Sequence, residues 1–523
     1  ITLSLFFAAL YTTLNSYKDI LDEDQQSDIL QLKRKLVLKK TQSDIRVVPQ
    51  IQGGNHDDFM GLLAKIGIIP KHPIPKFAGL RRIEKAYNYF KKRIDTVLDD
   101  TCDKVFTMFR ILEKVNSAIL VMIEVSNHAD AYTLFESLNN RGTPLTSVDL
   151  IKNLLLSRLD INGNGNIDYY FSCWTGILSE LGEEYSDQER FFRQNYNAFR
   201  KKLNGPFYKG DRQYPLGTIA TRSTMLDIYE KIITKNPVAA LNELAENAAI
   251  YAGIILNKTD NLSEKQHESY LDLQRVQGAP SYLLIMYLIK QQDSLGVTDD
   301  DVVKICKLLV NFFVRRNLTD TPPTRDLTRI FMSFIENIEQ NDCHGSDIYS
   351  SLRDMLLSVS ASDKFFEEKL RGPVYDENSS ATRFILCMMA KRGMTRENAH
   401  DLWRKTNSNQ YVWSIEHIFP QGPNIPDCWV DMIAGGDREK AKEYQSLYVH
   451  TLGNLTITGY NSTLSNKAFA EKKERKDNNG QYIGYRNGLN LNYDICDKSE
   501  WTVDIIKART DRMVKEIMVM FVL

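Results

Sequence analysis

The chain has few cysteines, and none of them are spaced as paired metal ligands. Only seven of its 523 residues are Cys, and the motif C-x-x-C does not occur. The odd, scattered set argues against a disulfide framework and against a structural zinc site. It favours a reducing, cytoplasmic compartment. The cysteines stand at positions 102, 173, 306, 343, 387, 428 and 496.

An excess of charge of either sign is also absent. The 66 Lys and Arg residues almost balance the 67 Asp and Glu residues, which leaves a net charge of -1. Proteins that coat nucleic acid without regard to sequence usually carry a large positive charge, so this class is disfavoured. Any basic surface must be local.

Long hydrophobic runs are missing as well. The opening stretch ITLSLFFAALYTTL is apolar but only about a dozen residues long, and no basic residues lead into it. It is too short to span a bilayer, so we expect a buried first helix and no membrane partner. Because the chain starts inside this pattern without a cap, we also expect further chain upstream.

The patterning divides the chain into three expected domains and a mixed α+β fold. Residues 1–160 combine helical periodicity with two expected strands, at 46–54 and 116–125, which is typical of an α/β domain. Residues 161–392 read as almost wholly helical. Residues 393–523 hold the strand and helix signals described below.

No P-loop motif G-x-x-x-x-G-K-[ST] occurs, and the closest feature is a glycine turn before a capped helix at 135–156. One interpretation is a plain helix joint, with Gly142 in the turn and Thr146 or Ser147 as the cap. The other is a phosphate contact through the helix start, Arg141 and Lys152. The pattern leaves both open.

The stretch YVWSIEHIFPQ, residues 411–421, is where the residue order indicates chemistry. Residues 411–418 are expected to form a strand that ends before Pro420, with Glu416 and His417 on opposite faces unless the strand bends. Imidazole is the natural general base near neutral pH, and a carboxylate suits a hard cation such as Mg²⁺. Together they are what phosphodiester hydrolysis requires.

A second stretch, residues 450–476, supplies the remaining parts of such a site. Asn454 lies in an apolar strand and can hold the loop that carries the base through its amide. Asn461 begins the following helix and offers a second metal ligand. From Leu464 to Lys476, five Lys or Arg residues oppose two Glu residues, which gives a local charge of +3.

Each of these residues also has an ordinary explanation. A lone His is mostly a packing or surface residue, Asn is common in turns, and a Lys-rich helix is usually a solvated face. Their joint occurrence in this order, within about sixty residues, favours a nuclease.

These motifs resemble a known family. S-I-E-H-I-F-P-Q, H-T-L-G-N-L-T-I-T and N-S-T-L-S-N-K-A-F are similar to the HNH nuclease domain of GmrSD-type modification-dependent restriction endonucleases. The stretches ITLSLFFAAL, IQGGNHDDF and FESLNNRGTPLTSVDLIKN resemble the ParB-like, nucleotide-binding N-terminal domain of the same family. In that family an Asp-Gly-Gln-Gln-Arg motif precedes the position of Ile1, so the N-terminal domain is expected to lack its start.

The resemblance implies a fold and a function. The fold is an incomplete α/β ParB-like domain, a helical middle domain and a C-terminal ββα-metal HNH domain with flanking helices. The function is a bacterial anti-phage endonuclease or nickase that cuts DNA, often modified phage DNA, with Mg²⁺ or Mn²⁺ as cofactor. An NTP is expected to govern the full-length protein, and a homo-oligomer is among the expected assemblies.

The resemblance also assigns roles by motif position. His417 is the expected general base, Glu416 a metal ligand and Asn454 the structural Asn, while Asn466 competes with Asn461 for the second ligand position. His450 is expected to support the strand or touch phosphate. The DNA contacts are expected from Lys467, Lys472 and Lys473.

Two functions of different classes remain open. The first is a metal-dependent DNA endonuclease, and the alternative is a DNA-binding or sensing regulator with an inactive HNH-like fold. RNA cleavage is a third case, since the local motif does not distinguish the sugar.

Overall fold

The computed structural model describes residues 1–38, 44–49, 55–75, 82–119, 146–161, 167–204, 219–394, 399–406 and 410–523. These residues are mostly helical, and within them a two-stranded sheet forms from β1 and β2. The chain divides into two compact units. Unit 1 contains Ile1–Pro144 with Gly165–Thr175, and unit 2 contains Leu145–Asn164 with Gly176–Leu523.

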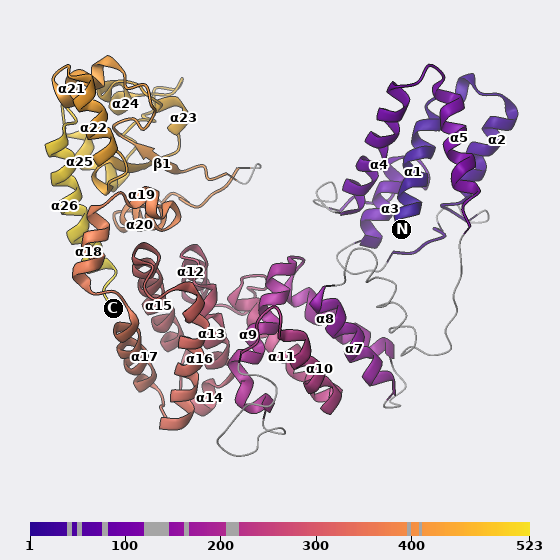
Figure 1. The fold of residues 1–523 in the computed structure, drawn as a ribbon, viewed down its shortest axis with the longest axis horizontal. Coiled ribbons are helices and arrows are strands. Elements are labelled where there is room, and N and C mark those ends of the chain that lie inside the picture. The colour runs from indigo at the N-terminus through magenta and orange to yellow at the C-terminus, as the bar shows by residue number, and fades with distance from the viewer. Residues whose placement is uncertain are drawn as a thin grey trace. The chain divides into compact units, whose positions relative to one another are not determined.

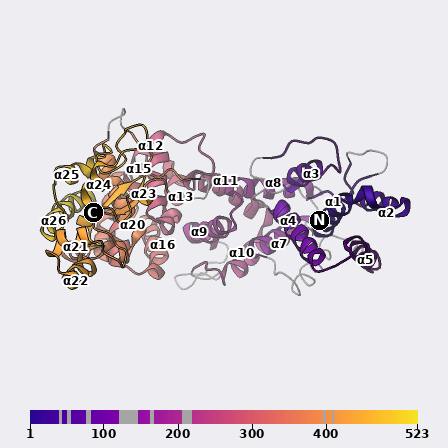
Figure 2. The ribbon, with the colours of Figure 1, turned by 90° about the horizontal axis from the view of Figure 1, so that it is seen from above.

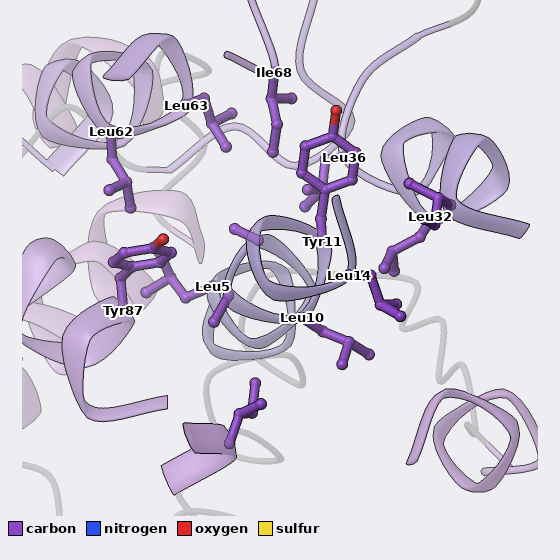
Figure 3. Close-up of a cluster of buried hydrophobic side chains, with 14 of the residues drawn as sticks. Leu5, Leu10, Tyr11, Leu14, Leu32, Leu36, Leu62, Leu63, Ile68 and Tyr87 are labelled. Atoms are coloured by element: carbon purple, nitrogen blue, oxygen red, sulfur yellow. The ribbon is translucent and has the colours of Figure 1, made fainter. Parts of the chain in front are cut away.

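Unit 1 is a helical cluster around α1 (Figure 1). The first helix is apolar on most of its circumference, so it is buried by neighbours on several sides. Figure 3 shows Leu5, Leu10, Tyr11 and Leu14 of α1 pointing outward into side chains from the surrounding segments. The buried first helix predicted from the sequence is therefore confirmed. The elements are α1 (Thr2–Asn15), η1 (Lys18–Ile20), α2 (Glu23–Arg34), α3 (Asn55–Lys65), α4 (Arg82–Asp99) and α5 (Lys104–Asn116).

The strands predicted for the N-terminal region are not tested in full. Of the first, residues 46–49 form no strand, and residues 50–54 lie outside the described residues; a single bridge pairs Val37 with Ile45 nearby. Of the second, residues 120–125 lie outside the described residues. The ParB-like α/β fold of this region stays a prediction.

Unit 2 begins as layered helices, as predicted for residues 161–392. Figures 1 and 2 both place α13 beside α15 and α16. The sequence of α13, YLLIMYLIK, is apolar on nearly every face, which suits its burial at the centre of these layers. The helices are α7 (Ser147–Ile161), α8 (Ile167–Leu181, of which the residues up to Thr175 belong to unit 1), α9 (Tyr185–Asn204), α10 (Met225–Lys235), α11 (Pro237–Ile254), α12 (Glu264–Arg275), η6 (Ala279–Ser281), α13 (Tyr282–Lys290), α14 (Gln292–Leu295), α15 (Asp299–Thr319), α16 (Thr324–Asn341), α17 (Ser346–Val359), α18 (Asp363–Arg371), α19 (Val374–Glu377) and α20 (Ser379–Arg392).

The C-terminal part of unit 2 surrounds the sheet. Its core contains five buried aromatic side chains, and the rings of two of them, Phe469 and Trp501, stack at 5.4 Å. The elements are β1 (Ser414–His417), α21 (Asp427–Ala434), α22 (Arg438–Tyr448), η7 (Leu452–Asn454), β2 (Leu455–Thr458), α23 (Asn461–Leu464), α24 (Phe469–Glu474), η8 (Asn490–Asn492), α25 (Tyr493–Cys496) and α26 (Val503–Met520).

The prediction of one continuous basic helix after β2 is wrong. The chain forms two short helices, α23 and α24, and Ser465 between them has φ of 41°. A positive φ is incompatible with a right-handed helix, so the helical pattern breaks there. The indole Nε1 of Trp429 donates to the carbonyl of Lys467 at 2.9 Å and fixes this break against the core.

The last helix joins the C-terminal part to the helical layers. The side chain of Asn311 on α15 donates to the carbonyl of Val522 at 2.8 Å, and Arg371 on α18 forms an ion pair with Asp511 on α26. The predicted domain boundaries at 160 and 392 stay predictions. None of the helices among the described residues is long and apolar enough to cross a membrane.

Candidate active site

Two short antiparallel strands, β1 and β2, position the predicted catalytic residues. In β1, Ser414 pairs with Thr458 of β2, and His417 pairs with Leu455. The strand is shorter than the stretch 411–418 predicted from the sequence. Adjacent residues on a strand point to opposite faces, so Glu416 and His417 enter different surroundings.

Asn454 is the last residue of η7 and lies just before β2, not within a strand as expected. It holds the turn that follows His417. Its side chain accepts from the amide of Phe419 at 2.8 Å and donates to the carbonyls of Phe419 at 3.0 Å and Val449 at 2.9 Å. The indole of Trp501 adds a fourth hydrogen bond, to Asn454 Oδ1 at 3.1 Å. With every polar atom of this fully buried amide paired, the turn after β1 has one fixed conformation.

His417 lies in an aromatic enclosure. Its side chain is 6 % exposed, and its Nε2 lies 3.1 Å from His450 Nδ1. The ring of Tyr375 meets it edge to face, with centroids 4.7 Å apart. Burial, and then the neighbouring His450 and Lys472, lower the pKa of His417 to about 3. The imidazole is therefore neutral at physiological pH, the form that can accept a proton.

Two further residues reach this enclosure from α19. Tyr375 stacks on the ring of His450, with centroids 5.3 Å apart and planes 12° apart, and its amide donates to the carbonyl of His450 at 3.3 Å. The carboxylate of Asp376 lies 3.5 Å from His450 Nε2. Neither residue was predicted, because both stand in a four-residue helix that carries no motif and lies some forty residues before His417.

Glu416 points to the other face of β1 and forms a buried ion pair. Its Oε1 accepts from Lys472 Nζ at 2.7 Å and from the hydroxyl of Tyr485 at 3.2 Å. Lys472 also donates to the carbonyls of His417 at 3.0 Å and Ile418 at 3.1 Å, so all three ammonium protons are used. Burial raises the pKa of the Glu416 carboxyl and lowers that of the Lys472 ammonium.

This pair corrects two expectations. The side chain of Lys472 is 0 % exposed, so its ammonium is not available to DNA. The carboxylate of Glu416 already faces a cation, and the side chain is 3 % exposed, so it does not fit as a ligand of a divalent metal. Among the described residues, no three or more His, Cys, Asp or Glu side chains lie close enough together to hold a metal ion.

An open cleft of about 1090 Å³ runs past His417. It brings His417 together with Asn461 and Asn466, the two residues that compete for the second ligand position. The side-chain amide of Asn461 donates to the carbonyl of Ile415 at 2.8 Å. Arg383 and Glu416 are the cation and the anion among the lining residues, and most of the others are uncharged. The cleft is larger than a typical small-molecule pocket, which suits a polymer strand.

Two contacts hold the side chain of Arg383 in place in the lining of this cleft. Its guanidinium lies 3.7 Å from the ring centroid of Tyr411, and its Nη2 donates to the carbonyl of Trp413 at 2.8 Å. Tyr411 belongs to the segment just before β1 and forms an isolated antiparallel β-bridge with Lys405. The cation is thereby fixed before any ligand arrives.

The remaining predicted residues lie elsewhere or are not described. Lys467 pairs with Glu471 at 3.5 Å, Lys473 donates to the carbonyl of Lys498 at 2.8 Å, and neither lines the cleft. Arg141 lies outside the described residues. Lys152, on α7, is 3.8 Å from Asp149.

The start of α7 has the side-chain cap that was expected for a plain helix joint. The hydroxyl of Thr146 accepts from the amide of Asp149 at 3.2 Å, and the Asp149 carboxylate accepts in return from the amide of Thr146 at 3.3 Å. This reciprocal pair is a capping box, so Thr146 is the cap. It does not decide whether Lys152 contacts a nucleotide.

Comparison with known families gives two matches. Residues 360–516 match the model of GmrSD restriction endonucleases, C-terminal domain, and residues 1–156 match the model of their N-terminal domain. Together the two matches cover more than half of the chain, and the first contains His417, His450, Asp376 and the lining of the cleft. No curated protein matches the chain.

Proposed function

The chain belongs to the GmrSD family of restriction endonucleases, and from that membership we propose that it cuts DNA in the cleft lined by His417. The family makes it a nuclease of a restriction system. The observation that supports this location is that the imidazole of His417, oriented by His450 and Tyr375, is among the residues that line an open cleft. A general base must be within reach of the water from which it takes a proton.

In this proposal the site is an HNH-type nuclease with a ββα arrangement of β1, β2 and α23. His417 accepts a proton from the attacking water as the water oxygen forms its bond to phosphorus. The bond from phosphorus to the leaving sugar oxygen breaks in the same displacement. Asn454 keeps the backbone after His417 fixed, and Arg383 is placed to contact phosphate.

Metal dependence is a separate proposal. It rests on the HNH-like order of residues and not on ligand geometry, since the carboxylate of Glu416 is paired with Lys472. A metal would stabilise charge on the phosphate when bound, with the side-chain oxygens of Asn461 and Asn466 as the predicted ligands on the cleft. The test is cleavage in Mg²⁺, in Mn²⁺ and in a chelator, together with calorimetric titration of Mn²⁺ into the wild type and into Asn461→Leu.

Five finer features complete the proposal. The substrate is modified phage DNA, an NTP governs cutting through a ParB-like N-terminal domain, and the product is a nick or a double-strand break. The protein acts in a homo-oligomer, and the scattered cysteines support a cytoplasmic location. Cleavage of matched modified and unmodified phage DNA, with and without nucleotide and at stated salt, tests the first three.

The deciding experiment compares wild type with His417→Gln on plasmid DNA. Gln keeps a polar group near the position of Nε2 but does not act as a base, so cutting should fall at least 100-fold, within the usual range for a general base. DNA binding at matched salt should be retained. Equal cutting by both proteins would contradict the proposed base.

A DNA-binding regulator without nuclease activity is the second candidate. The observation that favours it is the buried ion pair of Glu416, which removes the expected metal ligand. It predicts retention of DNA with no product under any divalent metal. Metal-dependent, His417-dependent nicking would remove it.

A further inference from the structure

A chain of three side chains ends at the proposed base. Asp376 Oδ1 lies 3.5 Å from His450 Nε2, and His450 Nδ1 lies 3.1 Å from His417 Nε2. Three separate segments supply the three residues: α19, the turn before η7, and the end of β1. A neutral imidazole carries one proton, which can lie on either of its two nitrogens, and the neighbouring groups decide which nitrogen holds it.

With one proton on each imidazole, the carboxylate selects one of two assignments. An ionised carboxylate only accepts, so the proton of His450 lies on Nε2, toward Asp376. The lone pair at His450 Nδ1 then accepts from His417 Nε2, which lies 3.1 Å away. This leaves the lone pair of His417 on Nδ1, away from His450. The reverse assignment would place the Nε2 lone pair of His450 against the negative charge of Asp376.

We propose that Asp376 and His450 are positioning residues that fix the tautomer of His417, with the proton on Nε2 and the free lone pair on Nδ1. This inference rests on the proposed function, because it names the nitrogen that acts as the base. Neither residue needs to touch DNA, which replaces the sequence-based expectation of a phosphate contact by His450.

Tyr375 gives the arrangement its geometry. It stacks on His450 and meets His417 edge to face, and the two imidazole planes stand 85° apart. The edge of the His450 ring is thereby directed at one nitrogen of His417. Two charged groups lie next to these three side chains. Lys472 donates to the backbone carbonyl of His417, and Asp376 is the anion beside His450.

The first test reads the tautomer directly and does not depend on activity. The protein has eight histidines, so ring ¹⁵N labelling of histidine with resonances assigned by single His→Gln variants resolves His417. We expect wild-type His417 to carry its proton on Nε2 at pH 7. Asp376→Ala should convert a measurable fraction to the Nδ1-protonated form. A wild-type His417 protonated on Nδ1 would overturn the proposal, as would an Asp376→Ala spectrum unchanged at His417.

The second test uses single-turnover cleavage with saturating protein, which separates chemistry from binding. His450→Asn keeps an acceptor oxygen near the position of Nδ1 and should retain most of the rate, whereas His450→Ala should lose about 100-fold. Asp376→Ala should lose about tenfold, the value of one modest charged hydrogen bond, and Asp376→Glu should recover part of it.

A matched control is available in the turn after α16. His344 Nε2 lies 3.0 Å from Asp342 Oδ1 in an exposed pair, and neither residue lines the cleft, so Asp342→Ala removes the same kind of contact and should leave the rate unchanged. Equal rates for His450→Asn and His450→Ala would overturn the positioning role. Cutting that is unaffected in His417→Gln would instead overturn the proposed base, while the tautomer experiment would still stand.

Discussion

The ion pair of Glu416 and Lys472 is the most buried charge in the candidate site, and it makes a prediction about stability. Breaking a buried pair on one side leaves an uncompensated charge, which costs about 3–5 kcal/mol. Lys472→Met should therefore lower the free energy of unfolding by that amount in urea titrations. Since apolar residues of similar size replace a buried pair at little cost, the double variant Glu416→Leu with Lys472→Met should recover most of the loss.

Lys467→Met is the control for this prediction. Lys467 is partly exposed and pairs with Glu471 at the surface, where an ion pair contributes about 0–1 kcal/mol. A Lys472→Met variant as stable as Lys467→Met would show that Glu416 and Lys472 are not paired in solution. It would also reopen Glu416 as a metal ligand.

His417 makes a prediction about pH. Its folded-state pKa is about 3, against an ordinary value of 6.5 in the unfolded chain. The unfolded state therefore binds a proton first as the pH falls. The contribution of neutral His417 to stability is complete above pH 6.5 and is lost progressively toward pH 3, at about 1.4 kcal/mol per pH unit.

The measurement is the free energy of unfolding of wild type minus that of His417→Gln, from pH 7.5 to pH 5. The difference should shrink as the pH falls below 6.5. The same subtraction for His344→Gln, at an exposed histidine, provides the comparison. A difference that does not change with pH would mean that His417 is not held neutral by burial.

At the scale of elements, α20 carries Arg383, and Tyr411 in the segment before β1 holds its guanidinium at the cleft. Since Arg383 is the cation among the lining residues, Arg383→Met should weaken DNA binding in the non-cutting His417→Gln protein. The slope of log Kobs against log salt should become shallower by about 1, as expected for one phosphate contact. Fluorescence anisotropy over a salt series measures both.

Arg275→Met is a closely matched control. Arg275 stacks on Trp403 of the same segment, also at 3.7 Å, but it lines a different cavity. Its loss removes a similar stacking contact without removing charge from the cleft, so DNA affinity and the salt slope should stay unchanged. Equal effects of the two substitutions would indicate that both act by loosening the segment.

The sequence predicted this site in part, and the reason lies in what local patterns carry. Each strand has its own local apolar run, so β1 and β2 could be placed from the residues alone. The hydrogen bond of Asn454 to the turn 35 positions earlier agrees with the role expected from the order of the motifs. Ion-pair partners have no such signal. Lys472 was predicted to contact DNA from a basic helix, yet it is buried against Glu416, which is 56 positions earlier in the chain.

The same limit explains the missed residues. Tyr375 and Asp376 come from a four-residue helix in the region predicted as a separate helical domain. Nothing in their own neighbourhood indicates chemistry, and only the packing of α19 against the segment around His450 gives them a role. The break at Ser465 was missed for a related reason, because the charged run that begins at Lys467 continued a helical pattern after it.

At the scale of the whole molecule, the candidate site belongs to one unit. Every residue of the site lies in unit 2, and the buried cluster around α1 lies in unit 1 with its own core. Units with separate cores can unfold in separate transitions. The tryptophans allow the two to be distinguished, because four of the five lie in unit 2 and Trp174 lies in unit 1.

Leu14→Ala and Lys472→Met should therefore act on different transitions. Leu14 is fully buried in unit 1, so its truncation should cost unit 1 about 2–5 kcal/mol. Far-UV circular dichroism reports both units, and it should show an earlier loss of helix in Leu14→Ala. Tryptophan fluorescence should change little, since it reports mainly unit 2. Lys472→Met should do the reverse and shift the fluorescence transition. If either substitution moved both signals together, the two cores would be coupled in one cooperative unit, and the nuclease site would depend on the stability of the N-terminal helices.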